Sequence, residues 1–148
     1  MLILSIIIII LDQITKKWAL DNLRLGPSRV IIKDFFELTY VENSGAAFGI
    51  LQNRKLLFVV ITVLVVGGIL TYMYRNNKTM SLLERVSLLS IMAGAIGNFI
   101  DRIFRGYVID FFSFQFGNYY FPVFNIADIA IVIGTGLLIF IILSTSGK

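Results

Sequence analysis

The sequence predicts an all-α membrane protein with four transmembrane helices and a small extracytoplasmic β-sheet and loop region. Of its 148 residues, 57% are hydrophobic and 15% are charged, whereas soluble domains carry closer to a quarter charged residues. The mean hydropathy is +0.87. Because one membrane span needs about 20 residues, this length fits a single bundle of about four spans. We therefore expect residues 1–148 to form one integral-membrane domain.

Four apolar runs account for the expected helices, which we place at about 1–20, 56–74, 82–100 and 125–143. The first run is aliphatic up to Leu11 and then carries charged residues and Trp18, as expected where a helix meets the lipid headgroups. Asp12 and Lys16 are four residues apart there, so they can pair on one face of the helix. The third run contains small residues, including Gly94 and Gly97, that suit close helix packing in lipid.

Two stretches between these runs, 21–54 and 101–124, look more like water-exposed segments, and we expect them outside the cytoplasm. In the first, Phe35 to Val41 is rich in strand-forming residues with partial alternation. In the second, Gly117-Asn118 predicts a hairpin turn. A two-residue turn there would set Asp110 opposite Asn125. The bias of Lys and Arg among the loops is contradictory and does not fix the orientation.

Composition excludes several kinds of chemistry. The chain has no Cys and no His, which excludes disulfides, thiol nucleophiles, zinc sites built on those ligands and a Ser-His-Asp triad. The net charge of +4 suits a protein among anionic lipids. This charge is too small and too scattered to favour nucleic acid as a partner.

Four carboxylates fall at the ends of apolar segments: Asp12, Asp101, Asp110 and Asp128. Because successive spans cross the membrane in opposite directions, these four ends should lie at one membrane face. An ionisable side chain in the bilayer costs about 3 kcal/mol or more, so such residues are functional candidates. Two carboxylates held close together in a site of low dielectric share a proton, which allows one to act as a base toward water and the other as an acid. This is the chemistry of aspartyl peptidases.

Sequence neighbours suggest which two carboxylates react. Asp101 is followed by Arg102, whose positive charge suggests a structural or orienting pair. Asp110 and Asp128 have no basic residue next to them in the sequence, so desolvation should raise a pKa most readily at these two. We therefore expect Asp110 and Asp128 to form the reacting pair, with Asp101 as the next candidate. The alternative is that the carboxylates only hold the bundle together, through Asn98, Asn125, Lys16 and Arg102.

Other activities are less well supported. A proton-linked transporter is the main competitor, because intramembrane carboxylates also form proton relays. Four short spans without an inverted repeat argue mildly against it. A serine peptidase would need a lysine within reach of Ser44, and the sequence implies none.

Five sequence blocks stand in order along the chain: DQITK at 12–16, NSGAAFG at 43–49, GAIGNFIDR at 94–102, GYVIDF at 106–111 and FPVFNIAD at 121–128. Together they resemble the bacterial lipoprotein signal peptidases, also called signal peptidase II. The resemblance implies a four-helix aspartyl peptidase of the bacterial cytoplasmic membrane, with cytoplasmic termini and a site near the outer leaflet. Its substrates would be prolipoproteins whose cysteine carries diacylglycerol, cut just before that cysteine.

The resemblance also implies roles for individual residues. The catalytic pair falls on Asp110 and Asp128. Seven further residues fall on positions that orient the pair or contact substrate: Asp12, Lys16, Asn43, Asn98, Asp101, Arg102 and Asn125. No metal or organic cofactor is implied. We expect a monomer whose partners are its lipidated substrates and membrane lipid.

Overall fold

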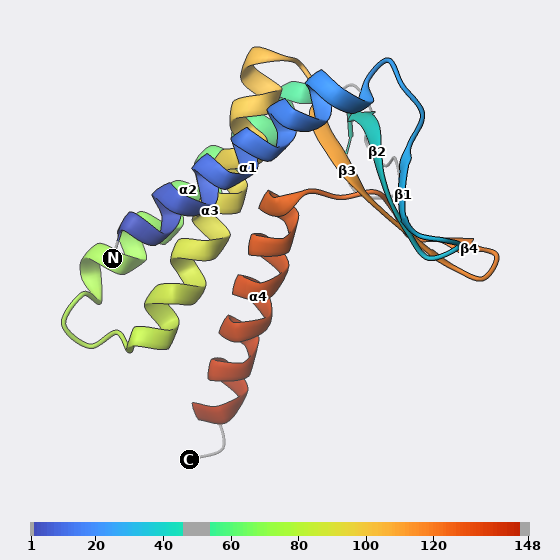
Figure 1. Cartoon of the computed structure of the whole chain (residues 1–148). Coiled ribbons are helices and arrows are strands. Elements are labelled where there is room, and N and C mark those ends of the chain that lie inside the picture. Colours follow the sequence, from blue (N-terminus) through green and yellow to red (C-terminus); the bar gives the residue numbers. More distant parts are fainter. Residues whose placement is uncertain (1, 46–53, 146–148) are drawn as a thin grey trace.

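The computed structural model describes residues 2–45 and 54–145, which form four helices and four strands (Figure 1). In chain order these are α1 (Leu2–Leu23), β1 (Arg29–Ile32), β2 (Phe36–Asn43), α2 (Lys55–Arg75), α3 (Leu82–Phe104), β3 (Val108–Phe116), β4 (Tyr119–Tyr120) and α4 (Ile126–Thr145).

Helix α3 is the centre of the bundle, because it packs against α1, α2 and α4. The start of α1, the connection between α2 and α3, and the end of α4 lie at one end of the bundle, and the sheet projects from the other end (Figure 1). Ser81 and Glu84 fix the start of α3 through a capping box, in which each side chain bonds the other residue's backbone N–H. The sequence-based helix limits are close to those observed.

Helix α3 continues past the expected end at residue 100, so Asp101 and Arg102 lie in its last turns. Its last residue is Phe104 and its C-cap is Arg105, and Gly106 follows with a φ of +88°. The N–H of Gly106 donates to the carbonyl of Arg102 at 3.2 Å, as in a helix ended by a glycine in the left-handed conformation. The stop signal is therefore this glycine, and the charged pair before it does not interrupt the helix.

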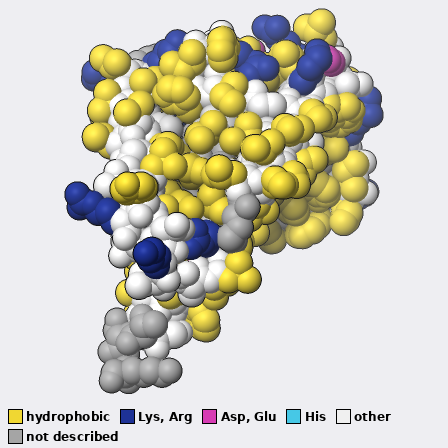
Figure 2. Space-filling view, turned by 90° about the vertical axis from the view of Figure 1, so that its left-hand side faces the viewer, with side chains coloured by type: hydrophobic (Ala, Val, Ile, Leu, Met, Phe, Trp, Pro, Cys, Tyr) yellow, Lys and Arg dark blue, Asp and Glu magenta, His cyan; other side chains and the backbone are white. Residues whose placement is uncertain are grey.

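Among residues 2–45 and 54–145, three helices are long and apolar enough to cross a membrane: α2, α3 and residues Ile126–Ser144 of α4. Helix α1 is aliphatic in its first half but carries Asp12, Lys16 and Lys17 further on. Asp12 and Lys16 are completely buried inside the bundle. Hydrophobic side chains cover the middle of the face shown in Figure 2, with Lys and Arg side chains toward its upper and lower ends. The structure therefore has the surface of a membrane protein.

The four strands form one antiparallel sheet in the order β1-β2-β3-β4. The sheet is attached to the bundle through a small core in which Ala19 and Leu23 of α1 pack with Ile109 and Phe111 of β3. This contact holds β3, and with it Asp110, against the end of α1.

The predicted hairpin exists, but its register changes along its length. Near the turn, Phe116 pairs with Tyr119, as a turn at Gly117-Asn118 requires. Closer to the bundle, the N–H groups of Phe111 and Phe112 both donate to the carbonyl of Phe124, at 3.1 and 2.9 Å. Two residues opposite one is the pattern of a β-bulge. Asn125 is therefore close to Asp110 but is not its direct pairing partner in the sheet.

Candidate active site

Asp128 lies in the first turn of α4 and is part of a reciprocal cap with Asn125. The Asn125 Oδ1 accepts from the N–H of Asp128 at 3.0 Å, and the Asp128 Oδ2 accepts from the N–H of Asn125 at 3.2 Å. This is the arrangement of a capping box, with Asp in place of the usual Glu or Gln. The positive end of the helix dipole favours a negative charge at this position.

Asp12 of α1 provides a second cap for the same helix. Its Oδ1 accepts from the N–H of Ala127 at 2.9 Å, and its Oδ2 lies 2.9 Å from the Lys16 Nζ. The expected pairing of Asp12 and Lys16 at i, i+4 is thus confirmed. Asp12 joins α1 to the start of α4, directly beside Asp128.

Lys16 is completely buried and uses all three of its donors. Its Nζ lies 2.9 Å from Asp12, 3.0 Å from Asp101 and 2.9 Å from the Oδ1 of Asn98. Asp101 also pairs with Arg105, the C-cap residue that directly follows α3. Two carboxylates and two cations therefore balance one another, which is what keeps charges at this depth from being prohibitively costly.

Asp110 lies on β3 with 2% of its surface exposed. Its Oδ2 accepts from the Nδ2 of Asn43 at 2.9 Å, and its Oδ1 accepts from the Nδ2 of Asn125 at 2.6 Å. Burial raises the pKa of the Asp110 carboxyl to about 7, and the nearby charge of Asp128 adds to the increase. Asp110 is therefore a carboxyl that exchanges a proton near neutral pH.

The two carboxylates line one cavity of about 760 Å³. The cavity has a polar end formed by Asn43, Asn98, Arg102, Asp110 and Asp128. Its remaining wall is mainly apolar and comes from α2, α3, α4 and the segment before α4, including Phe58, Ile61, Val65, Ile91, Phe121, Ile129 and Val132. The carboxylates thus face a space that is mostly apolar and large enough for a segment of peptide or lipid.

Arg102 lines the same cavity, and its positive charge acts on both Asp110 and Asp128. Its guanidinium donates to the carbonyl of Gly45 at 3.0 Å and lies 4.5 Å from the centre of the Phe58 ring. The expected pairing of Arg102 with Asp101 is wrong. Consecutive residues on a helix point in different directions, so Arg105, four residues after Asp101, takes that place.

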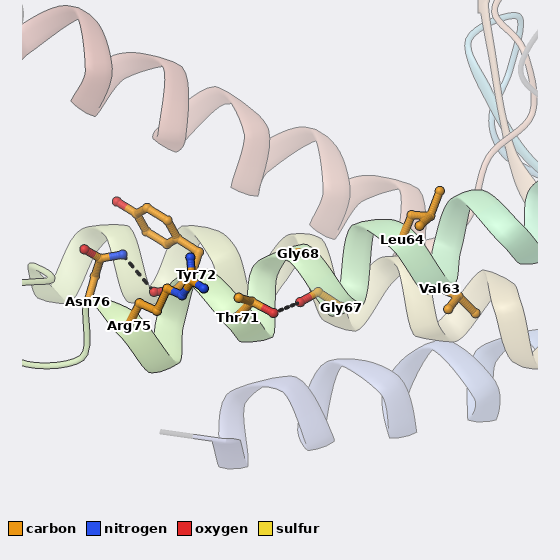
Figure 3. A pocket seen from close by; sticks show the side chains of 8 residues that line it. All are labelled: Val63, Leu64, Gly67, Gly68, Thr71, Tyr72, Arg75 and Asn76. Carbon is orange, nitrogen blue, oxygen red and sulfur yellow. Dashed lines mark hydrogen bonds between the residues drawn. The ribbon is translucent and has the colours of Figure 1, made fainter.

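A second pocket of about 580 Å³ lies along α2, and neither Asp110 nor Asp128 lines it (Figure 3). It is lined by Val63, Leu64, Gly67, Gly68, Thr71, Tyr72, Arg75 and Asn76. Thr71 and Asn76 bond to carbonyls of their own helix, and no lining residue is acidic. Within residues 2–45 and 54–145, no group of three or more His, Cys, Asp or Glu side chains could hold a metal ion.

The family model described as signal peptidase (SPase) II matches residues 4–144 of the sequence. The chain belongs to the signal peptidase II family. A lipoprotein signal peptidase of Clostridium acetobutylicum is 46% identical over 142 residues, covering 95% of this chain and 92% of its own. A lipoprotein signal peptidase of Bacillus pumilus is 46% identical over 146 residues, covering 99% of this chain and 93% of its own. A solved structure described as a bacterial membrane enzyme has a TM-score of 0.89 at 35% identity, covering 99% of this chain and 89% of its own.

In this family member, eight of the nine residues expected at the site form one continuous network of hydrogen bonds and ion pairs: Asp12, Lys16, Asn43, Asn98, Asp101, Asp110, Asn125 and Asp128. Arg102 joins it through Gly45, whose N–H donates to Asn43. The part of the 43–49 block from Ala46 to Gly49 lies outside the described residues.

Sequence reasoning missed three contributors to this network. Gln13 donates to Asp12 at 3.1 Å and to the Gly97 carbonyl at 3.2 Å, and Arg105 pairs with Asp101. Phe58 stacks on Arg102. The i, i+4 spacing of Asp101 and Arg105 was a usable signal, whereas nothing in the sequence connects Phe58 to a residue 44 positions later.

Proposed function

We propose that this protein is an aspartic endopeptidase that removes the signal peptide from diacylglyceryl-modified prolipoproteins, cutting just before the lipidated cysteine. Membership of the signal peptidase II family supports the substrate class. The observation that carries the aspartic type is the placement of Asp110 and Asp128, which line one cavity and are both bonded to Asn125. Family membership also favours a peptidase over a proton-linked transporter.

The proposed reaction uses water as the nucleophile. One carboxylate of the pair takes a proton from water while the other gives a proton to the carbonyl oxygen of the scissile bond. The raised pKa of Asp110, about 7, supports this division because it allows one member to stay protonated near neutral pH. Asn43, Asn98 and Asn125 would hold the two carboxylates in place, since each donates to at least one of them.

The cavity also suits the proposed substrate. Its apolar walls on α2 and α4 would accept a lipidated segment of chain beside the polar end. Burying acyl chains yields about 0.8 kcal/mol per CH₂, so the diacylglyceryl group would hold the scissile bond at the depth of the carboxylates. Apolar walls would also limit the entry of water other than the nucleophile.

We propose that α1 is a fourth span, because its charged residues Asp12 and Lys16 are buried against α3 and α4 and need not meet lipid. The termini and the connection between α2 and α3 would then be cytoplasmic. The carboxylates, at the sheet end of the bundle, would lie near the outer leaflet of the cytoplasmic membrane. We propose that the protein acts as a monomer.

The direct test is cleavage by the purified protein of a prolipoprotein peptide carrying diacylglyceryl-cysteine, beside the same peptide with an unmodified cysteine. Mass spectrometry of the products should show a single cut before the lipidated cysteine and little cutting of the unmodified peptide. A folded protein that cuts neither peptide would contradict the proposal, and proton flux into liposomes would then be measured.

A further inference from the structure

We propose that Lys16 is a positioning residue for the carboxylate pair: acting through Asn98, it holds Asp128 as the ionised base and leaves Asp110 as the carboxylic acid. This inference rests on the proposed function, because it assigns the two roles within that pair. Lys16 itself touches neither Asp110 nor Asp128 in any hydrogen bond of the structure's described part.

The first step is the orientation of the Asn98 amide. Its Oδ1 lies 2.9 Å from the Lys16 Nζ and also accepts from the Nδ2 of Asn125 at 3.2 Å. An ammonium group only donates, so the oxygen of Asn98 must face Lys16. The Nδ2 of Asn98 must therefore face Asp128, whose Oδ1 lies 2.7 Å away. If the Asn98 amide were rotated by 180°, its NH₂ group would face the Lys16 ammonium and its oxygen would face the Asp128 carboxylate.

The second step is that Lys16 cannot move away from Asn98. It is completely buried, and Asp12 and Asp101 hold its ammonium from two sides at 2.9 and 3.0 Å. Its charge also polarises the Asn98 amide, because hydrogen bonds in series strengthen one another. The Asn98 Nδ2 group that donates to Asp128 is therefore fixed in direction, and the positive charge of Lys16 strengthens its hydrogen bond.

The third step is the difference between the two carboxylates. Each accepts two hydrogen bonds, so the number of donors does not separate them. Asp128 lies in the first turn of α4, where the helix dipole favours an anion. One of its two donors is Asn98, whose oxygen accepts a hydrogen bond from Lys16. Asp110 lies on a strand, is 2% exposed, and accepts from two neutral side-chain amides.

Other charges also act on the two carboxylates of the pair. Arg102 acts on both carboxylates. Lys16 also acts on Asp110 over a longer distance. Charged groups that face the pair, or Lys16 and Asn98, come from α1, α3 and its C-cap, β3 and α4: Asp12, Lys16, Asp101, Arg102, Arg105, Asp110 and Asp128.

The assignment gives a balanced reaction. Water loses a proton to Asp128 as its oxygen bonds to the carbonyl carbon, and the proton of Asp110 moves to the carbonyl oxygen. When the carbon–nitrogen bond breaks, Asp128 gives its proton to the leaving amine and Asp110 recovers one from the new hydroxyl. Both carboxylates thus return to their starting states, and no other reactant is needed.

Infrared spectroscopy tests the assignment without turnover. At pH 5.5 the parent should show the absorption of a buried carboxylic acid that is missing from Asp110→Asn and present in Asp128→Asn. Loss of this absorption in Asp128→Asn and its retention in Asp110→Asn would overturn the assignment. A parent that does not cleave substrate would instead contradict the proposed function, so the two failures are distinguishable.

The role of Lys16 is tested by the pH dependence of kcat/KM, whose acid limb reports protonation of the base. Lys16→Met should move the acid limb up by about one pH unit, as expected for removal of a nearby opposite charge, with a smaller shift of the alkaline limb. Because Lys16→Met leaves Asp12 and Asp101 partly unpaired, the charge-balanced variant Asp12→Asn with Lys16→Met is the matched control for folding.

Asn98→Ala should shift the acid limb in the same direction, because it removes the donor on Asp128 and leaves Lys16 in place. Folded variants whose activity falls equally at every pH, with no shift of the acid limb, would show a merely structural role and overturn the proposal.

Discussion

Asp12 and Ala127 are joined across 115 positions of the chain, because the Asp12 Oδ1 accepts from the N–H of Ala127 at 2.9 Å. This bond fixes α1 against the first turn of α4, one residue before Asp128. Asp12 also bonds Lys16 and Gln13. A residue that belongs to the first helix in sequence thus determines how the last helix presents its carboxylate.

Removing this contact should destabilise the fold. Asp12→Ala leaves the N–H of Ala127 without its partner and Lys16 without one of its two carboxylates, and breaking a buried ion pair costs about 3–5 kcal/mol. Asp12→Asn should cost clearly less, since its side-chain oxygen can still accept from Ala127. Thermal unfolding of the purified proteins in detergent measures both. Equal losses for the two variants would show that the cap on α4 contributes nothing.

Gly97 is expected to be a position where even one methyl group is harmful. A Cβ there would lie 2.6 Å from the Asp12 Oδ2 and 3.3 Å from the Ala127 Cβ. Gly97→Ala should therefore lower stability by about 1–3 kcal/mol, as overpacking does, and should lower activity by displacing Asp12.

Gly136→Ala is the matched control for Gly97→Ala, because a Cβ at Gly136 meets nothing within 4 Å. Alanine is the better helix former by up to about 1 kcal/mol, so this variant should be neutral or slightly stabilised. If the two alanine variants unfolded at the same temperature, the close approach of Gly97 to Asp12 would be contradicted.

Asp110 should make the stability of the fold depend on pH. Its pKa in the folded protein, about 7, is above its ordinary value of 3.8, so folding favours the protonated form. The stability linked to Asp110 is therefore complete below about pH 4 and is lost as the pH rises through 7. Between pH 5 and 8 this loss is roughly 3 kcal/mol at 1.36 kcal/mol per pKa unit.

Asp110→Asn lacks this titration, so its unfolding temperature relative to the parent should rise between pH 5 and pH 8. Asp34→Asn is a suitable control, because Asp34 is exposed on the turn between β1 and β2. If the difference in unfolding temperature between the parent and Asp110→Asn stayed constant from pH 5 to pH 8, the raised pKa of Asp110 would be contradicted.

Arg102 should support activity without being indispensable. Lysine at this position keeps the charge but loses the planar group that both stacks on Phe58 and donates to Gly45. Arg102→Lys should then retain activity reduced by about tenfold, which corresponds to about 1.4 kcal/mol. Arg85→Lys, which changes the two hydrogen bonds that Arg85 donates to Asn77, should cleave like the parent. Complete loss in a folded Arg102→Lys protein would instead argue for a direct catalytic role.

The sequence predicted local relationships well. Asp12 and Lys16 pair because residues four apart share a helix face, and the turn at Gly117-Asn118 brings Asn125 to Asp110. It also predicted which polar residues gather at the site, because polar side chains are rare among such apolar segments and must find one another.

The sequence failed where contacts depend on packing between distant segments. Lys16 bonds Asn98 across 82 positions, and no spacing rule connects them. The assignment of Arg102 to Asp101 failed because adjacency along the chain was used where helix geometry decides. The one-residue shift near Phe124 was missed because the bulge at Phe111 and Phe112, opposite Phe124, leaves no mark in the turn itself.

The most direct test of the account is cleavage of a diacylglyceryl-modified prolipoprotein by the parent, Asp110→Asn and Asp128→Asn proteins, each shown to be folded by its thermal unfolding. The account predicts cleavage by the parent and a loss of at least about a thousandfold in both variants, because neither half of the pair can supply base and acid alone. Near-parental cleavage by either folded variant would contradict the assignment of Asp110 and Asp128 as the catalytic pair.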